Sequence, residues 1–308
     1  MITALSMNPC IDLTLYIDKL NPGGSHRAKR HRKDVAGKAV NVVYALKNFG
    51  IPCRLLGFDY IENGAVLKEP LELAGISYDL LPVEGAIRTN IKIFEEDNQV
   101  MTEINQEGAY VPAEAVSALI EKTANVKTDL LILSGSLPQG LDDGVYGDII
   151  KRVKAPVILD AYGPALSKGL LAGAYLIKPN LFELEQTFGV SAPSRESQIS
   201  LCRDLLRQYA KLRAVCLSLG KDGALMIGRD EAFFSPALDI TVRGVQGAGD
   251  SLVAGMAALL MESVDAPLDA LLKHAVAAAS ASLIREGTLM AAKEGFDEMI
   301  ERVEIFGV

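Results

Sequence analysis

Cysteine, targeting segments and long apolar runs are scarce or missing in this chain of 308 residues. Its four cysteines, Cys10, Cys53, Cys202 and Cys216, show no CxxC spacing. They are therefore expected to be small buried apolar residues in a reducing compartment. No apolar run is long enough to span a membrane, and the N-terminus has no basic-then-apolar leader. These absences predict a cytoplasmic globular protein without a membrane partner.

Several common binding motifs are also missing. The chain has no GxxxxGK[ST] motif, which argues against a P-loop kinase. Its first apolar run leads into Asn8-Pro9-Cys10 without a glycine fingerprint, which argues against a nicotinamide dehydrogenase. No cluster of zinc ligands is present, and the net charge of −8 gives no reason to expect nucleic acid as a partner. The hydrophobic content of 49% is nevertheless enough for a large core.

Short apolar runs alternate with longer helical patterns along the chain. Strands are predicted at Ile2–Met7, Arg54–Phe58, Leu130–Ser134, Val157–Asp160, Tyr175–Ile177 and Ala214–Leu219. Helices are predicted at Ala39–Phe49, Pro112–Ala124 and Ser197–Tyr209. Continuous apolar strands that alternate with helices predict an α/β fold with a parallel sheet covered on both faces.

Two regions interrupt this alternation, at about residues 11–35 and 88–105. Alternating side chains in Thr89–Phe94 and Val100–Ile104, on either side of Glu95–Asn98, predict a β-hairpin half exposed to water. Together the two regions are expected to form a small β-sheet lid beside the main body. An exposed sheet of this kind usually covers a ligand or another subunit.

The run Gly247-Ala248-Gly249-Asp250-Ser251 precedes apolar residues at helical spacing, so a helix is expected to begin near Asp250. Free backbone N–H groups and the helix dipole at such a start suit the charge of a phosphoryl group in transfer. Asp250 could accept the proton of an attacking hydroxyl. A plain glycine turn, in which Asp250 and Ser251 only cap the helix, is equally open at this point.

Other polar residues follow predicted strands, at Ser134–Pro138, Asp160, Lys178–Asn180 and Ser218–Gly220. Ligands of open α/β sheets bind beyond the carboxyl ends of the strands. One such segment alone is more often an ordinary loop, but several together predict a binding crevice.

Three further features each have a functional and a structural interpretation. Asn180 and Glu183, three residues apart at an expected helix start, suit Mg²⁺ bound through waters or, equally, a helix cap. The basic run His26–Lys33 is typical of a solvated surface, although in a lid it could bind an anion. His274, on an alanine-rich helical stretch, is expected to be a packed histidine rather than a catalyst.

Six motifs, in order along nearly the whole chain, resemble those of the ribokinase-like (PfkB) carbohydrate kinases. The similarity is strongest to the branch of 1-phosphofructokinase and tagatose-6-phosphate kinase. The matching segments are Asn8–Asp12 (NPxxD), Ala36–Asn41 (GGKGxN), Thr89–Lys92 with Thr102–Asn105 (TRxNxK and TEIN), Ser134–Gly140 (SGSLPxG), Lys178–Glu183 (KPNxxE) and Gly247–Asp250 (GAGD). The chain departs from the family pattern at Ala36, Ala39 and Arg285–Thr288.

The resemblance implies an ATP- and Mg²⁺-dependent kinase with one ribokinase-like domain over residues 1–308. Its α/β fold would have a doubly wound, mainly parallel sheet and a small β-sheet lid that is often shared across a homodimer. It implies that Asp250 is the catalytic base and that Gly247, Ala248 and Gly249 form the anion hole. It places at the sugar phosphate Asp12, Gly37, Lys38, Asn41, Arg88, Lys92 and Ser136. It places at the nucleotide Lys178, Asn180, Ser218, Gly220 and Gly223, with Glu183 near Mg²⁺.

The acceptor is expected to carry a phosphate already. Lys38, Arg88 and Lys92 surround the predicted sugar site, and unpaired cations there would favour an anionic partner. The favoured reaction converts fructose 1-phosphate and ATP to fructose 1,6-bisphosphate and ADP. Tagatose 6-phosphate or another related sugar remains an alternative acceptor. A non-catalytic sensor of sugar phosphate or nucleotide is an alternative of another class, which the altered loop at Ala36–Ala39 keeps open.

Overall fold

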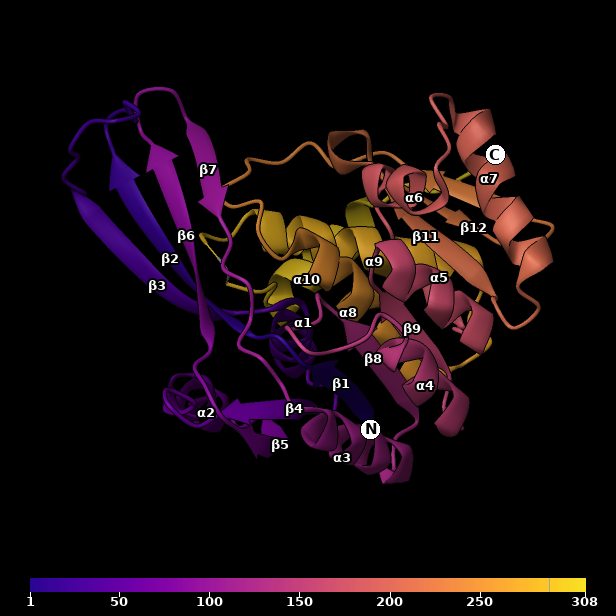
Figure 1. Cartoon of the computed structure of the whole chain (residues 1–308). Coiled ribbons are helices and arrows are strands. Elements are labelled where there is room, and N and C mark those ends of the chain that lie inside the picture. Colours follow the sequence, from indigo (N-terminus) through magenta and orange to yellow (C-terminus); the bar gives the residue numbers. More distant parts are fainter. Residues whose placement is uncertain (288) are drawn as a thin grey trace.

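The computed structural model describes residues 1–287 and 289–308. Within them, ten strands form a large sheet with the order β14-β13-β12-β11-β10-β9-β8-β1-β4-β5 (Figure 1). The sheet is parallel from β5 to β11 and antiparallel from β11 to β14. In chain order its strands are β1 Ile2–Ser6, β4 Cys53–Tyr60, β5 Ser77–Val83, β8 Leu130–Ser134, β9 Val157–Asp160, β10 Leu176–Ile177, β11 Ala214–Ser218, β12 Ala224–Ile227, β13 Ala232–Ser235 and β14 Phe306–Gly307.

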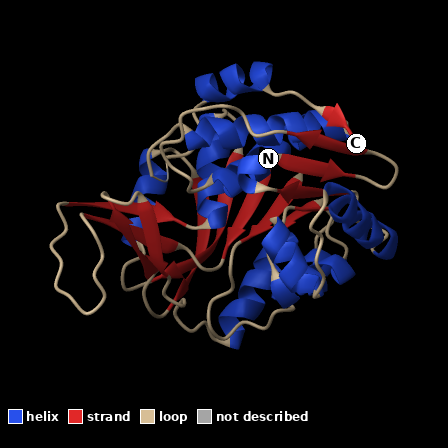
Figure 2. Ribbon diagram, turned by 90° about the horizontal axis from the view of Figure 1, so that it is seen from above, coloured by secondary structure: helices blue, strands red, loops and turns tan. Residues whose placement is uncertain are grey.

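Helices cover both faces of the large sheet (Figure 2). One layer consists of α1 Lys38–Asn48, α8 Ala248–Glu262, α9 Leu268–Leu283 and α10 Lys293–Arg302. The other consists of α3 Ala113–Asn125, α4 Val145–Arg152, α5 Gly163–Ala172, α6 Leu181–Phe188 and α7 Arg195–Gln208. Helix α2, Ala65–Leu73, contacts β5, and a 3₁₀ turn at Gly220–Asp222 follows β11. No helix in the described part of the chain is both long and apolar enough to cross a bilayer.

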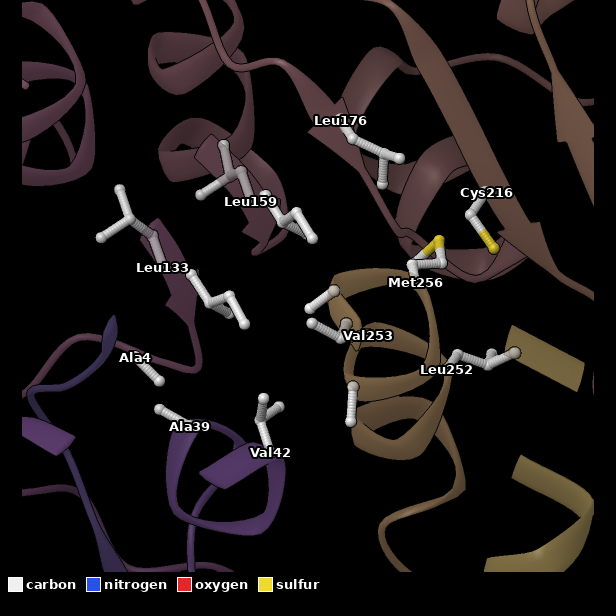
Figure 3. Close-up of a cluster of buried hydrophobic side chains, with 14 of the residues drawn as sticks. Ala4, Ala39, Val42, Leu133, Leu159, Leu176, Cys216, Leu252, Val253 and Met256 are labelled. Atoms are coloured by element: carbon white, nitrogen blue, oxygen red, sulfur yellow. The ribbon is translucent and has the colours of Figure 1, made fainter. Parts of the chain in front are cut away.

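The core lies between the large sheet and its helices (Figure 3). Side chains of β1, β8 and β9 are buried along the whole length of each strand. Ala39 of α1 faces Ala4 of β1, and Val42 of α1 and Val253 of α8 point toward Leu133 and Leu159 of the sheet. Because the central strands are covered on both sides, they carry continuous apolar runs, which made them visible in the sequence.

The small sheet stands away from the main body (Figure 1, indigo to magenta) and has the order β3-β2-β6-β7. Its strands are β2 Cys10–Ile17, β3 Arg30–Ala36, β6 Arg88–Glu95 and β7 Val100–Ile104. Strands β2 and β6 are parallel, whereas β3 and β7 pair antiparallel to their neighbours. The predicted small sheet, and the hairpin within it, are therefore confirmed.

The doubly wound, mainly parallel sheet is also confirmed, and each strand and helix predicted above occurs within two residues of its expected bounds. The edge strand β5 and the antiparallel β12, β13 and β14 were not predicted. Strand β5 is only partly buried and contains Pro82, as an edge strand can, so it lacks a continuous apolar run. Strand β14 has only two residues. The four cysteines are free and buried, as expected.

Candidate active site

A cavity of about 1020 Å³ lies between the carboxyl ends of the large-sheet strands and the small sheet. Every site residue predicted from the sequence lines it, so segments far apart in the chain meet at one place. These residues are Asp12, Gly37, Lys38, Asn41, Arg88, Lys92, Ser136, Lys178, Asn180, Glu183, Ser218, Gly220, Gly223, Gly247, Ala248, Gly249 and Asp250.

The start of α8 forms one wall of this cavity. Gly247 precedes the helix in the left-handed conformation, with φ 74°, and a Cβ there would lie 2.3 Å from the Met290 methyl group. The Met290 side chain could move aside, but another residue would be strained in this left-handed conformation, so glycine is favoured here. The first N–H groups of the helix have no intrahelical partner and are left for an anion. Lys178 lies beside them, because a Cβ added to Gly249 would be 3.5 Å from its Nζ.

Asp250 is buried in the first turn of α8. Its Oδ2 accepts a hydrogen bond of 2.7 Å from Asn41 Nδ2 of α1, so the side chain is held by another helix rather than used as a cap. Burial, and then the negative charge of Asp160, raise the pKa of Asp250 to about 6. A carboxyl group with this pKa is largely ionised at neutral pH and can still accept a proton readily.

Asp160, at the end of β9, is completely buried between two lysines. Its Oδ1 lies 3.2 Å from Lys178 Nζ and 3.3 Å from Lys38 Nζ, and Ser134 donates a hydrogen bond of 2.9 Å to its Oδ2. Burial alone would raise the pKa of Asp160, but Lys178, Lys38 and Ser134 together lower it. The sequence had marked Asp160 only as a polar residue after a strand, and it was not among the predicted site residues.

Lys38 links this buried pair to the start of α6. Its Nζ lies 3.7 Å from Glu183 Oε1. Burial by itself lowers the pKa of Lys38, but Asp160, Glu183 and Asp250 together raise it, so the lysine stays charged. Lys38 was predicted at the sugar. In the structure it lies between the residues predicted at the sugar and those predicted at the nucleotide.

Asn180 and Glu183 form a capping box at the start of α6. Asn180 Oδ1 accepts from the Glu183 N–H at 2.7 Å, and Glu183 Oε2 accepts from the Asn180 N–H at 2.9 Å. The cap interpretation is therefore correct, but it occupies only one oxygen of Glu183. No group of three acidic, His or Cys side chains among the described residues could hold a metal by itself. Glu183 Oε1 fits a hydrated ion, because Mg²⁺ usually keeps several of its waters.

Three predicted nucleotide residues lie at and after the end of β11: Ser218 is its last residue, and Gly220 and Gly223 belong to the tight turn that follows. Gly223 has φ 103°, and a Cβ there would lie 2.0 Å from the Ser235 carbonyl oxygen. Glycine is thus required for the turn to lie against the following strands. The turn leaves backbone groups at the cavity surface, where a ligand can approach closely.

The small sheet supplies the other end of the cavity. Lys92 Nζ lies 2.6 Å from Asp12 Oδ2, and Asn90 Nδ2 donates to Asp12 Oδ1 at 3.1 Å. All three side chains are buried. Lys92 already has a carboxylate partner, as does Lys38, so the expectation that these two cations are unpaired was wrong.

Arg88 differs from both lysines, because no carboxylate of the described residues lies within 4 Å of its guanidinium group. Its Nη1 donates to Asn90 Oδ1 at 3.1 Å and to the Gln106 carbonyl at 3.0 Å, and its buried Nε has no hydrogen-bond partner. Arg88 also lines a smaller adjoining cavity of about 150 Å³ together with Lys38 and Ser136. Of the three cations predicted at the acceptor site, Lys38 and Lys92 are paired with carboxylates, whereas Arg88 can still bind an anion.

The basic run lies outside the cavity. Lys29 is 3.3 Å from Glu96, and Arg32 is 2.8 Å from Asp34. The solvated-surface interpretation is therefore correct for this run. His274 also lies elsewhere, with Nδ1 2.9 Å from the Ala270 carbonyl oxygen, as a packed histidine would.

The altered loop at Ala36–Ala39 introduces no backbone strain. Gly37 takes the positive φ, 129°, whereas Ala36 ends β3 and Ala39 lies in α1 without one. The chain also departs from the family pattern at Arg285–Thr288. Residues 285–287 of this segment do not line the cavity, and Thr288 lies outside the described residues.

Sequence reasoning missed several polar residues of the cavity. Besides Asp160 they include Asn8, Asn90, Glu103, Asn105, Gln106, Glu107, Gln139 and Tyr162. Most lie within or next to the matched motifs, so their position beside a matched residue could have indicated that they line the cavity.

The chain is similar in sequence to known carbohydrate kinases and in fold to a phosphofructokinase. A model of the pfkB family carbohydrate kinases matches residues 5–294. A 1-phosphofructokinase of Xanthomonas campestris pv. campestris is 31% identical, over 84% of this chain and 83% of the relative. A tagatose-6-phosphate kinase of Staphylococcus epidermidis is 28% identical over the whole of both chains. The structure of phosphofructokinase-2 from Escherichia coli superposes with a TM-score of 0.91, at 23% identity and with 98% of each chain covered.

Proposed function

The chain belongs to the pfkB family of carbohydrate kinases, and we propose that it transfers the γ-phosphoryl group of ATP to a sugar phosphate. Fructose 1-phosphate is the favoured acceptor, which would give fructose 1,6-bisphosphate and ADP. The name of the relative with 31% identity supports this choice. The tagatose-6-phosphate kinase relative keeps tagatose 6-phosphate as the second candidate.

One observation carries the proposal: a buried carboxylate with a raised pKa lies at a glycine-preceded helix start. Asp250 is held by Asn41 and has no cationic partner within salt-bridge distance among the described residues. A sensor without catalytic activity would have no need for such a group, because an unpaired buried carboxylate is unfavourable for folding. This argues for an enzyme.

In the proposed step, Asp250 takes the proton of the acceptor hydroxyl as its oxygen attacks the γ-phosphorus. The new P–O bond forms in line with the P–O bond to ADP, which breaks. Free N–H groups of Gly247, Ala248 and Gly249 are suited to the charge on the transferred group. Lys178, close to this helix start, is suited to the phosphates of the nucleotide.

The remaining nucleotide contacts are proposed for Asn180, Ser218, Gly220 and Gly223. Glu183 would hold Mg²⁺ through waters, with its Oε1. When bound, the ion would neutralise charge on the nucleotide phosphates.

Arg88 is proposed to bind the phosphate that the acceptor already carries. It is the acceptor-side cation without a carboxylate partner among the described residues, and a guanidinium group suits phosphate because it donates paired, charge-assisted hydrogen bonds. Asp12, Gly37, Asn41 and Ser136, which line the same cavity, are proposed to contact the sugar.

The direct test is ADP release with ATP and a panel of acceptors: fructose 1-phosphate, tagatose 6-phosphate, fructose 6-phosphate, fructose and tagatose. The expected result is the highest kcat/KM with fructose 1-phosphate. A preference for a neutral sugar would overturn the phosphorylated acceptor, and no turnover with any sugar, despite nucleotide binding, would favour a sensor.

We further propose that the small sheet acts as a lid and joins two copies of the chain. Its outer strand β7 exposes Val100 and Ile104, at 48% and 55%. Light scattering should then report a dimer at micromolar concentration. A strict monomer would argue against the shared lid but leave the proposed reaction untouched.

A further inference from the structure

The segment that follows β7, residues 105–108, forms a wall of the cavity beside Arg88. It is fixed on the side of the main body, since Gln139 donates a hydrogen bond of 2.5 Å to Glu107. A Cβ on Gly108 would lie 2.2 Å from the Asn8 oxygen, so the chain runs close against the end of β1. The wall therefore has a defined place between the small sheet and the large one.

Gln106 fixes the other side of this wall, because its side chain takes the hydrogen bond that a backbone group would make in a continued strand ladder. The ladder between β6 and β7 ends at Ile91 and Ile104, and its continuation would set Thr89 opposite Gln106. A continued ladder would use backbone groups of both residues. Instead, the Thr89 N–H donates to the side-chain oxygen of Gln106, at 2.7 Å.

This side-chain hydrogen bond leaves the backbone carbonyl of Gln106 available, and Arg88 Nη1 donates to it at 3.0 Å. The same nitrogen donates to Asn90 Oδ1, which orients the guanidinium group from the other side. Arg88 thus obtains its orientation from neutral acceptors that leave its positive charge uncompensated. A carboxylate in the place of either acceptor would compete with an anionic ligand.

We propose that Gln106 is a positioning residue that holds Arg88 ready for the phosphate of the acceptor, because its side chain takes the Thr89 N–H and frees its own carbonyl for the guanidinium group. This inference rests on the proposed function, since it needs a phosphorylated acceptor. It makes Gln106 a determinant of acceptor affinity, although the residue is exposed and does not itself have to touch the substrate.

The test uses Gln106→Met, which keeps the length of the side chain but removes the oxygen acceptor. Steady-state kinetics are measured with fructose 1-phosphate, with fructose and with varied ATP. The KM for fructose 1-phosphate should rise about 3- to 10-fold, as expected for one lost hydrogen bond. The kcat, the KM for ATP and the KM for fructose should stay within about twofold of wild type.

A double-mutant cycle with Arg88→Ala separates positioning from general packing. If Gln106 acts through Arg88, Gln106→Met should add no further increase of KM in the Arg88→Ala background. An equal increase in both backgrounds, or a change of all the kinetic constants together, would overturn the role. Gln99→Met is the matched control, because Gln99 is an exposed glutamine of the β6–β7 turn that donates to a backbone carbonyl and does not line the cavity.

Gln106→Glu gives an independent readout, which remains usable if the methionine variant is unstable. Glutamate keeps an acceptor for the Thr89 N–H but adds a negative charge to the wall. The KM for fructose 1-phosphate should rise at low salt, and this increase should shrink as ionic strength screens the charge. The increase caused by Gln106→Met should persist. A glutamate variant indistinguishable from wild type at low salt would contradict the proposal.

The same experiments separate a failure of the proposed acceptor from a failure of the proposed role of Gln106. If wild type uses fructose as well as fructose 1-phosphate, the proposed phosphorylated acceptor fails, and the role of Gln106 fails with it. If wild type prefers fructose 1-phosphate and Arg88→Ala loses this preference while Gln106→Met leaves the KM for fructose 1-phosphate unchanged, only the role of Gln106 is overturned.

Discussion

The end of β9 and the start of α8 each bring a buried aspartate to the same cavity, and the two carboxyl groups behave oppositely. Asp160 lies between Lys38 and Lys178 and receives a hydrogen bond from Ser134, and its pKa is lowered despite burial. Asp250 receives one hydrogen bond from a neutral amide, and burial and Asp160 raise its pKa to about 6. A buried carboxylate that is paired with cations, such as Asp160, is suited to holding those side chains in place. A buried carboxylate without a cationic partner, such as Asp250, is suited to accepting a proton.

The two aspartates also affect folding stability with opposite signs. The folded-state pKa of Asp250 lies above its ordinary value of 3.8, so its contribution to stability falls as pH rises from about 4 to 6. The folded-state pKa of Asp160 lies below 3.8, so its contribution is present above that pH and is lost as pH falls through the lower value. Removing each carboxylate should therefore have different consequences.

The largest effect is expected from Asp250→Asn. The amide keeps the size of the side chain but cannot take a proton, so kcat should fall by roughly 10²- to 10⁴-fold. Nucleotide affinity, measured by calorimetry, should survive as the control for folding. Turnover close to wild type would show that Asp250 is not the catalytic base.

Arg88→Ala extends the comparison to the acceptor end, where Lys92 is paired and Arg88 has no carboxylate partner among the described residues. The kcat/KM for fructose 1-phosphate should fall by about 10- to 100-fold, as for a lost hydrogen-bonded charge pair. The kcat/KM for fructose, measured in the same assay, should change much less. Equal losses for both acceptors would indicate that Arg88 supports the cavity without binding phosphate.

Asp160→Asn should move the pH profile of kcat. In wild type the rate should fall below about pH 6, as Asp250 becomes protonated. Without the negative charge of Asp160, and with Lys38 and Lys178 left unpaired, the pKa of Asp250 should decrease and this acidic limb should move to lower pH. Ser134→Ala, which removes only a neutral hydrogen bond to Asp160, is the matched control and should move the limb less.

The smallest of these effects is expected from Glu183→Gln. Glutamine can still accept the Asn180 N–H, so the capping box is preserved while the charge is removed. The Mg²⁺ concentration for half-maximal rate should rise about 10-fold, as for a residue that holds an ion through waters. The KM for fructose 1-phosphate should stay nearly unchanged. An unaltered Mg²⁺ titration would leave Glu183 as a helix cap alone.

Much of the fold and of the cavity could be predicted from local sequence. Strands β8 and β9 were predicted to the residue, because their buried apolar runs end in polar strand ends. The resemblance to the family motifs supplied most of the residues predicted at the cavity. The structure adds a reason for Gly247, which has a left-handed conformation at the start of α8. The edge strand β5 and the two-residue β14 could not be predicted, since strands of that kind depend on their neighbours.

Sequence by itself determined which residue types reach the cavity, because strand ends, helix starts and glycine turns are encoded within a few neighbouring residues. It could not show which charges are paired. Asp12 and Lys92 lie on different strands, and Asp160 meets Lys38 from a segment more than a hundred residues away. Only the tertiary structure brings them within 4 Å and leaves Asp250 and Arg88 without such partners among the described residues. The reason is physical: ion pairing and desolvation depend on distance and burial in space, and neither is fixed by position along the chain.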